Sequence, residues 1–564
     1  MKQDLKLVII GGVAAGPKAA ARARRLLPNA EITVIDRSRW ISYAGCGMPF
    51  FLDGQVDSFE ELFNTAYDVI RDEGYFLREK DITVLTSTEA LEVDRVKKSV
   101  LIRDLAGGEE RWIPYDKLVL ATGASPIIPP FEGRDLKGVY GLNNPGDLLR
   151  LMETVEDVNE AVVVGAGFIG MEVAGALSNR NILTTIVELR EQLLPGVLDE
   201  DLAGVLKTRL ESQGIDFALG QKVLRFEGEN GRVSRVVTDQ AVLDAEMVVM
   251  AVGVRPNIDL ALKAGLEIGN TGAIRVDEYM LTSDPEIYAC GDCAENVNIL
   301  SGRHTYVPLA SSANRQGRVV GDNTAGRRSK YNGILGTALL QVKNWNVGRT
   351  GLGEQQAQDY GYETKTAITP AHDRSHYHPQ HSLVILKVIA EAGSGRLLGV
   401  QGIGPGSLDK RIDVAATAIS FGATLDNIVD LDLGYAPPFN TTIDPLQHTA
   451  NTLRNKNSGL IPMISPREVW DKLQRGDDFI LLDVRTQREH DSKPMNDERV
   501  LHVIMGELRE RIDSISRDKE IVVFCDLGIR SYEALRALKG AGFTKVRSME
   551  GGMRLWAYGP VGML

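Results

Sequence analysis

The chain has 564 residues, of which 43% are apolar and 25% are charged, and its formal net charge is −12. This length predicts several domains, and an acidic balance without a long basic run argues against a general nucleic-acid binder. No apolar stretch approaches the roughly 20 residues needed to span a bilayer and no apolar leader precedes the first predicted strand, so we expect a cytoplasmic protein with no membrane partner.

The chain opens with the pattern of a dinucleotide-binding fold. Residues 5–10 form an apolar run typical of a buried parallel strand, and a glycine-rich loop and an Ala/Arg-rich helix follow. A second predicted strand, 31–36, ends in an acid that can bind ribose hydroxyls, while the glycines let a pyrophosphate approach the backbone. Val13 replaces the second glycine of GxGxxG, so the pattern is imperfect. The candidate cofactor residues here are Gly11, Gly12, Ala15, Gly16, Asp36 and Arg37.

The first predicted helix carries Lys18, Arg22 and Arg25 at a spacing that places three cations on one face. A solvated surface is the ordinary interpretation. The alternative is a patch that binds a phosphorylated substrate, with Ser42 as a further candidate substrate residue next to the segment described below.

A lone cysteine, Cys46, stands in the glycine-rich bend 41–51, which leads into a predicted helix N-terminus. Helix-terminal N–H groups favour a thiolate, so we expect a lowered thiol pKa at this position. No second cysteine lies nearby in the sequence, so a redox-active Cys46 would form mixed disulfides or persulfides with another molecule. A small buried residue in a turn is the alternative interpretation.

A second strand, loop and helix, 161–172, has the full GxGxxG spacing, with Gly165, Gly167 and Gly170 as candidate cofactor residues. The next predicted strand ends in Glu188, whose charge would repel a 2′-phosphate. We therefore expect NADH to be preferred. Arg190 weakens this preference, and use of NADPH stays open.

Three further segments resemble the two-dinucleotide-binding-domain flavoprotein reductases: 121–123, 251–257 and the Tyr-Ala-x-Gly-Asp run at 288–292. The resemblance implies FAD, with Asp292 on its ribityl chain. Cys290 and Cys293 have the spacing of a redox or metal pair, but their place in this segment favours packing beside the cofactor, and we assign no metal. The added cofactor candidates are Ala121, Thr122, Gly123, Gly253, Gly291 and Asp292.

Residues 327–451 show strand-rich alternation and then an Ala-rich helix. In the resembling reductases a third domain of this kind forms the dimer interface, which implies a homodimer. Tyr377 and Tyr435 stand in Pro-rich loops and, with the single Cys46, resemble the coenzyme A-disulfide reductase branch, whose paired tyrosines act near the cysteine, one of them from the partner subunit. This chain has His378 where that branch usually has a second tyrosine.

After a polar stretch at 452–461, predicted to be a linker, a smaller α/β unit begins. Its apolar strand 520–524 runs into a Cys-x4-Arg loop, which resembles that of a rhodanese domain and implies persulfide chemistry at Cys525 with Arg530. The usual His-x-Pro-Gly-Ala segment is absent, and Lys493 with its neighbours stands there instead. A rhodanese-like fold with an inert cysteine is the alternative.

The predicted fold class is therefore α/β, with an FAD-binding domain (1–155 and 276–326), an NAD(P)H-binding domain (156–275), an α+β dimerisation domain (327–451), a linker (452–461) and a rhodanese-like domain (462–564). The resemblance implies an FAD-dependent NAD(P)H oxidoreductase that reduces coenzyme A disulfide, coenzyme A persulfide or polysulfide through Cys46, with Cys525 relaying sulfane sulfur. Two alternatives stay open: an NADH oxidase or peroxidase that uses a Cys46 sulfenic acid, and a sulfur-carrier module that the flavoprotein reloads. The sequence does not rank the small-molecule thiol, disulfide and persulfide substrates.

Overall fold

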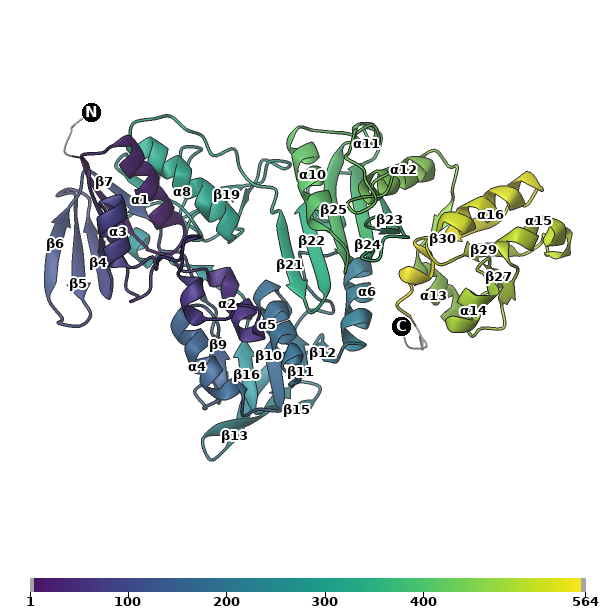
Figure 1. Cartoon of the computed structure of the whole chain (residues 1–564), viewed down its shortest axis with the longest axis horizontal. Helices are drawn as coiled ribbons and strands as arrows, with labels where there is room; N and C mark the ends of the chain where they lie inside the picture. The colour runs from purple at the N-terminus through teal and green to yellow at the C-terminus, as the bar shows by residue number, and fades with distance from the viewer. Residues whose placement is uncertain (1–4, 559–564) are drawn as a thin grey trace. The chain divides into compact units, whose positions relative to one another are not determined.

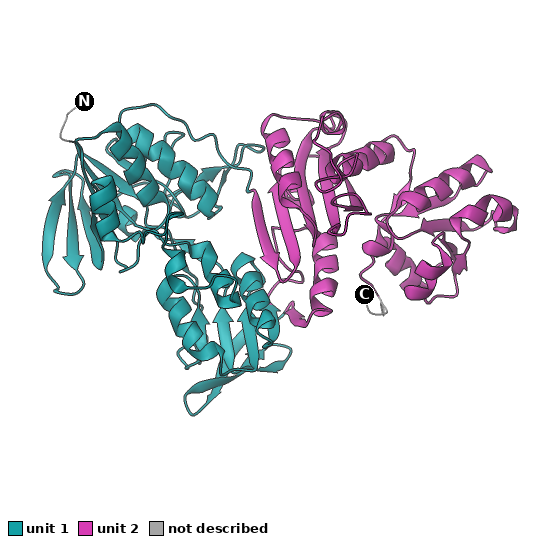
Figure 2. Cartoon of the chain, in the orientation of Figure 1, with its two compact units in different colours: residues 1–187, 221–336 teal, residues 188–220, 337–564 magenta. Residues whose placement is uncertain are grey.

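The computed structural model describes residues 5–558 in two compact units: unit 1 lies within 1–187 and 221–336, and unit 2 within 188–220 and 337–564 (Figure 2). The outermost residues of the first and last predicted domains, 1–4 and 559–564, lie outside the described residues. The predicted fold class is confirmed, and each unit is described by itself.

Unit 1 begins with a parallel five-stranded sheet in the order β18-β7-β1-β2-β3. Figure 1 labels strand β7 of this sheet and helix α1, which follows β1 in the chain. The central strand, β1, is apolar after its first residue, Lys6, and Leu7 and Ile9 have no exposed surface. Helices α1 and α8 lie side by side, and a three-stranded antiparallel sheet, β4-β5-β6, follows in the chain. The bounds are β1 Lys6–Ile10, α1 Ala15–Leu26, β2 Glu31–Ile35, α2 Met48–Asp53, α3 Glu73–Lys80, β3 Thr83–Leu85, β4 Thr88–Asp94, β5 Ser99–Asp104, β6 Glu110–Pro114, β7 Lys117–Leu120, β18 Ile287–Ala289 and α8 Ala310–Thr324.

The second dinucleotide fold of unit 1 has strands β11, β10, β16 and β9 in that order, paired in parallel. Helix α5 follows β10 and contacts α2, the short helix of the Cys46 segment. The bounds are β8 Ala124–Pro126, β9 Val139–Gly141, α4 Pro145–Val155, β10 Glu160–Val164, α5 Phe168–Asn179, β11 Leu183–Glu188, β13 Val223–Glu229, β14 Arg232–Thr238, β15 Val242–Asp244, β16 Met247–Met250, β17 Val254–Pro256 and α7 Asp259–Lys263.

Unit 2 contains the third domain, an antiparallel sheet in the order β21-β22-β25-β24-β23. Helix α10 packs on β22 and β25, and α12 packs on β23 and β24. The bounds are β21 Ala338–Val342, β22 Trp345–Gly351, α9 Glu354–Asp359, β23 Thr364–His372, β24 Leu383–Glu391, β25 Leu397–Gly404, α10 Asp409–Ser420, α11 Leu425–Val429 and α12 Pro445–Asn457.

Residues 188–220 group with unit 2, although we predicted one continuous domain over 156–275. This segment carries α6 (Glu200–Glu211) and β12 (Ile215–Leu219). The reason for the grouping is Lys387 of β24, which is 1% exposed and places its Nζ within 2.9 Å of carboxylates of Asp199, Asp201 and Glu354. A buried ammonium shared by three carboxylates ties the start of α6 to the third domain.

The last domain of unit 2 is a parallel five-stranded sheet in the order β26-β30-β29-β27-β28. Two apolar clusters fill its two faces, and both include fully buried residues of β27 and β29. The bounds are β26 Met463–Ile464, α13 Pro466–Arg475, β27 Phe479–Asp483, α14 Gln487–Ser492, β28 Val500–His502, α15 Leu508–Arg511, β29 Glu520–Phe524, α16 Ile529–Gly540 and β30 Val546–Met549.

The predicted linker over 452–461 is wrong in its first part, because α12 continues to Asn457. The polar residues that suggested a linker have partners there: Lys456 Nζ donates to Thr366 O at 2.9 Å and to Glu550 at 3.2 Å. Glu550 is buried and also accepts from the Ile368 N–H at 3.1 Å. The last domain is therefore docked on the third domain by a buried carboxylate. Among residues 5–558, every helix is too short or too polar to cross a lipid bilayer.

Candidate active sites

The first glycine-rich loop lies too close to its neighbours for side chains at two positions. A Cβ at Gly11, where φ is +114°, would lie 2.0 Å from Ala121 O, and one at Gly16 would lie 1.9 Å from Gly11 O. The Asp36 carboxylate accepts from the Gly12 N–H at 2.6 Å, and burial raises its pKa. Loop, helix and acid thus have the arrangement that holds a dinucleotide.

The Asp292 segment fits the flavin end of such a dinucleotide. Burial of the Asp292 carboxylate raises its pKa to about 6. A buried acid of this kind suits the hydroxyls of a ribityl chain. Cys290 and Cys293 are fully buried in the hydrophobic core of this fold, as the packing interpretation predicts. These residues fit FAD, which when bound would relay two electrons from a nicotinamide to a sulfur.

The second glycine-rich loop has equally close approaches. A Cβ at Gly165 would lie 2.4 Å from Ala251 O and one at Gly170 would lie 1.9 Å from Gly165 O, whereas Gly167, which precedes α5, has open space beside it. The Gly165 N–H donates to Val187 O at 2.8 Å, which sets the loop against the end of β11. Glu188 ends that strand and accepts from the Arg190 N–H at 2.9 Å, so its carboxylate is held in place. This arrangement fits an adenine ribose with a free 2′-hydroxyl.

Cys46 lies in a 3-10 turn, Gly45–Gly47, just before α2, and remains exposed. The expectation of a lowered thiol pKa is wrong. Desolvation of the sulfur by surrounding atoms, followed by the nearby carboxylates of Glu172 and Asp292, raises its pKa. The two acids come from the second and the first dinucleotide folds, so the thiol lies where the two cofactor sites of unit 1 meet.

We expect Glu172→Gln to lower the Cys46 pKa, because it removes a carboxylate that disfavours the thiolate. Burial raises the pKa of Glu172 itself to about 7, so its charge develops over the neutral pH range. Alkylation of Cys46 by iodoacetamide at pH 7 should become roughly three- to tenfold faster, since the thiolate is the nucleophile. The pH profile of alkylation, followed by mass spectrometry, measures this shift. Glu60→Gln, an exposed acid in the following segment, is the control, and an unmoved midpoint in Glu172→Gln would contradict the assignment.

The three cations predicted on one face of α1 have different surroundings in the structure. Arg22 forms an ion pair with Asp322 of α8 at 2.6 Å, whereas Lys18 and Arg25 are exposed. Ser42 is buried, and its N–H donates to Gly12 O at 2.7 Å, so it joins the Cys46 segment to the first glycine-rich loop. Lys18 and Arg25 are therefore the cations of this face that could meet an anionic substrate.

Tyr377 and Tyr435 lie together on the third domain. Hydrogen bonds from the side chains of Ser375 and Tyr435 lower the pKa of Tyr377. The two tyrosines are 65% and 46% exposed, so the pair is available to another molecule. Their roles near a cysteine stay predictions.

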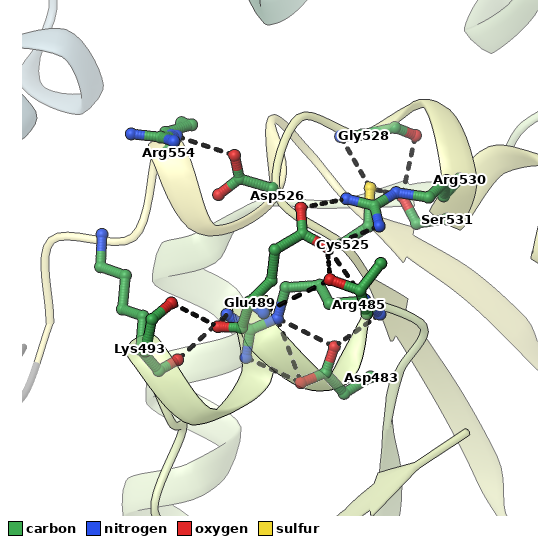
Figure 3. A network of polar contacts seen from close by, with 12 residues as sticks. Asp483, Arg485, Glu489, Lys493, Cys525, Asp526, Gly528, Arg530, Ser531 and Arg554 are labelled. Atoms are coloured by element: carbon green, nitrogen blue, oxygen red, sulfur yellow. Dashed lines mark hydrogen bonds and ion pairs between the residues drawn. The ribbon is translucent and has the colours of Figure 1, made fainter. Parts of the chain in front are cut away.

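The last domain places Cys525 at the end of β29, where the loop before α16 wraps its sulfur (Figure 3). The Gly528 N–H, at a residue with φ +100°, donates to Sγ at 3.1 Å, and the Ser531 hydroxyl lies 3.8 Å away. Cys525 is 1% exposed, so the thiol is enclosed by its loop. A loop of inward N–H groups is suited to a sulfur anion.

Arg530 of the Cys-x4-Arg loop is held by Glu489 of α14 through two hydrogen bonds of 2.6 and 2.7 Å (Figure 3). These bonds lower the pKa of Glu489 to about 2, and the Arg530–Glu489 ion pair lies beside the Cys525 loop. Glu489 was not predicted as a site residue, because it lies 41 residues before Arg530 in the chain.

A polar cluster of the buried Asp483 and the half-buried His490 and His502 has ligand atoms within 4.8 Å of one another. Asp483 already binds the Arg485 guanidinium at 2.7 Å and His490 Nδ1 at 2.9 Å. The two imidazoles are stacked with centroids 4.1 Å apart. Because a guanidinium occupies the carboxylate, we interpret this cluster as structural support for the loop.

Comparison with known proteins identifies the same domains. Residues 5–317 match the family model for pyridine nucleotide-disulphide oxidoreductases, 338–446 match the dimerisation domain of those enzymes, and 465–558 match the rhodanese-like domain. A solved NAD-dependent persulfide reductase from A. fulgidus is 42% identical with a TM-score of 0.94, covering 98% of this chain and 100% of that one.

Two curated relatives each match 80% of the chain. The NAD(P)H coenzyme A polysulfide/persulfide reductase of Pyrococcus horikoshii is 37% identical over 80% of this chain and 98% of its own length. An NADH oxidase of Methanocaldococcus jannaschii is 35% identical over 80% of this chain and 100% of its own length.

Proposed function

The chain belongs to the pyridine nucleotide-disulphide oxidoreductase family, and we propose that it is an FAD-dependent NAD(P)H oxidoreductase that reduces the S–S bond of coenzyme A persulfide, coenzyme A disulfide or polysulfide. The observation that carries this proposal is the exposed Cys46, whose charged neighbours Glu172 and Asp292 come from the two cofactor-binding folds. The relatives named as persulfide reductases support it. The proposal includes a homodimer formed through the third domain, and the cytoplasmic location stays a prediction.

Cys46 acts as the nucleophile of the proposed reaction. Its thiolate attacks the outer sulfur of a coenzyme A persulfide, so the donor S–S bond breaks, the coenzyme A thiolate leaves, and Cys46 holds a persulfide. Two electrons that originate from NADH then split this persulfide into hydrosulfide and the Cys46 thiolate. The net reaction converts persulfide, NADH and a proton into thiol, hydrogen sulfide and NAD⁺. In the proposal Tyr377 and Tyr435 act near the reacting cysteine, one of them from the partner subunit, as the resemblance to the coenzyme A-disulfide reductase branch implies.

Steady-state kinetics with a panel of acceptors test the proposal. We expect the highest kcat/KM with a coenzyme A-linked S–S acceptor, and with the persulfide one hydrosulfide should be released per NADH oxidised. A higher kcat/KM with peroxide or dioxygen than with every sulfur acceptor would instead assign the chain to the NADH oxidases, whose name some relatives carry.

NADH should be the better donor, by roughly tenfold in kcat/KM or ~1–2 kcal/mol. The reason is Glu188, whose carboxylate the Arg190 N–H holds at the end of β11, where a 2′-phosphate would meet it. Kinetics with both donors for the wild type and Glu188→Ala measure the effect, and the preference should shrink in the variant. Glu191→Ala, an exposed acid nearby, is the control. Equal or better use of NADPH by the wild type would show that Arg190 dominates.

Lys18 and Arg25 are proposed to attract the phosphates of a coenzyme A substrate. Replacing both with Ala should raise KM for coenzyme A persulfide by roughly five- to tenfold and leave inorganic polysulfide nearly unchanged, with a difference that shrinks at high salt. Arg22→Ala serves as the control, since its loss of the Asp322 pair should lower thermal stability and not change substrate choice. An equal loss for both substrates would indicate a folding role for this face.

A further inference from the structure

Three cationic side chains of unit 2 lie against the Cys525 loop, and the carboxylates beside them neutralise only part of their charge. Arg209 of α6 is 8% exposed and has no carboxylate within ion-pair distance among residues 5–558; its Nη2 donates to the carbonyl of Arg554 at 3.4 Å. Within the described part of the chain, the Lys493 ammonium is buried without any hydrogen-bond partner. Arg554 itself binds Asp526 at 2.9 Å. One carboxylate, that of Asp526, thus faces three cations. The three residues Arg209, Lys493 and Arg554 are here called the cation cluster.

Burial and the neighbouring cations act on these groups together. Burial, then Arg209 and Arg554, lower the pKa of Lys493 to about 7, although the Asp526 carboxylate opposes the shift. Arg485 also faces Lys493, but its charge is matched by Asp483. Burial and Arg554 lower the pKa of Arg209 to about 10. A buried ammonium with no acceptor is costly, so the cluster is built for a ligand that supplies negative charge and oxygen acceptors.

The cluster is joined to the sulfur site by the backbone. Asp526 directly follows Cys525, and the Met553 N–H, next to Arg554, donates to Cys525 O at 2.9 Å. Figure 3 shows Lys493 on the same side as Arg554 and Asp526, and Cys525 beyond Asp526. Lys493 lies within the rhodanese-like domain, whereas Arg209 comes from α6, outside that domain.

We propose that Arg209, Lys493 and Arg554 form a binding site for a tetrahedral dianion, which is the charged end of the sulfur donor or carrier that exchanges sulfur with Cys525. Two sources share this chemistry: the phosphate of a coenzyme A-type thiol and the sulfonate end of a thiosulfate-type donor. Lys493 contributes the unpaired donors, and the guanidinium groups contribute charge and orientation. The sulfur-carrying identity of the ligand rests on the proposed function, whereas anion binding itself does not.

The test measures anion binding without turnover. Amide hydrogen exchange of the FAD-loaded full chain is followed in α6 and in residues 550–556, with inorganic phosphate, thiosulfate or chloride at equal ionic strength. Exchange in both segments should slow with phosphate, thiosulfate or both, and not with chloride. Lys493→Met should weaken the apparent affinity by about tenfold or more.

Two further variants keep the result interpretable. Lys519→Met removes an exposed lysine that pairs with Asp478 in the same domain, and it should behave as wild type. Arg209→Gln should reproduce the loss seen in Lys493→Met. Protection by thiosulfate alone would support the site as a donor site, and protection by phosphate alone as a carrier site. No protection by either anion, or equal protection in the wild type and Lys493→Met, would overturn the proposal even if coenzyme A persulfide is turned over.

Discussion

Cys46→Ser should lower kcat for reduction of coenzyme A persulfide by roughly three orders of magnitude or more, because a hydroxyl at this position cannot form the persulfide. The thiol is exposed and lies near Glu172 and Asp292, so it is the sulfur that an acceptor can reach beside the cofactor sites of unit 1. The other two cysteines of this unit are fully buried and cannot replace it.

The same variant should keep the first half of the reaction. In the proposal, glycine-rich loops and acids hold the cofactors, and Cys46→Ser changes none of these residues. Anaerobic NADH should therefore bleach the flavin absorbance at the wild-type rate, which also shows that the variant is folded and loaded. If substantial persulfide reduction persists in this variant, Cys46 does not have the role proposed for it.

The sequence predicted the parts of the molecule that depend on short-range patterns. Both dinucleotide folds were visible because an apolar strand, close-approach glycines and a terminal acid lie within about 30 residues of each other. The Cys525 loop was visible for the same reason. In each case the backbone conformation is set by neighbouring residues, as in Gly11 and Gly528 with their positive φ angles.

The structure differed where side chains distant in the sequence decide the outcome. Arg22 pairs with Asp322, which lies 300 residues away in the chain. Its charge is therefore not available to the predicted substrate. Cys46 precedes a helix, but desolvation of its sulfur, followed by the carboxylates of Glu172 and Asp292, raises its pKa. Lys387 forms ion pairs that join residues 188–220 to the third domain. Lys456 forms an ion pair with Glu550, and the first part of the expected linker is an extension of α12. No local pattern in a single sequence reports such pairs.

The docking of the last domain bears on how sulfur leaves Cys525. A flexible linker would have let the domain carry sulfur by moving, but α12 runs to Asn457 and the buried Glu550 accepts from the Ile368 N–H and from Lys456. Arg467 of α13 also binds Glu200 of α6 at 2.9 Å. Sulfur from Cys525 is therefore expected to travel on a small carrier, and coenzyme A has the thiol for that task.

Cys525→Ser should consequently separate two kinds of substrate. Turnover of a freely diffusing coenzyme A persulfide should stay within about twofold of wild type, whereas use of bulky or polymeric sulfur, which needs a first transfer to a thiol, should fall by roughly ten- to hundredfold. The physical reason is that the Gly528 N–H and the Ser531 hydroxyl line a site for a sulfur anion, while the segment has none of the glycine loops that hold a flavin. Cys525 can thus relay sulfur but cannot receive electrons from NADH directly.

Assays of Cys46→Ser and Cys525→Ser on both kinds of donor check this prediction, with added coenzyme A as the variable. Wild-type turnover of polymeric sulfur should rise with coenzyme A concentration, and Cys525→Ser should lose that dependence because the carrier is no longer loaded. Lys519→Met, in the same domain, should keep it. If Cys525→Ser abolishes turnover of the small persulfide as completely as Cys46→Ser does, the two cysteines form one obligatory relay, and the independent role of Cys46 is wrong.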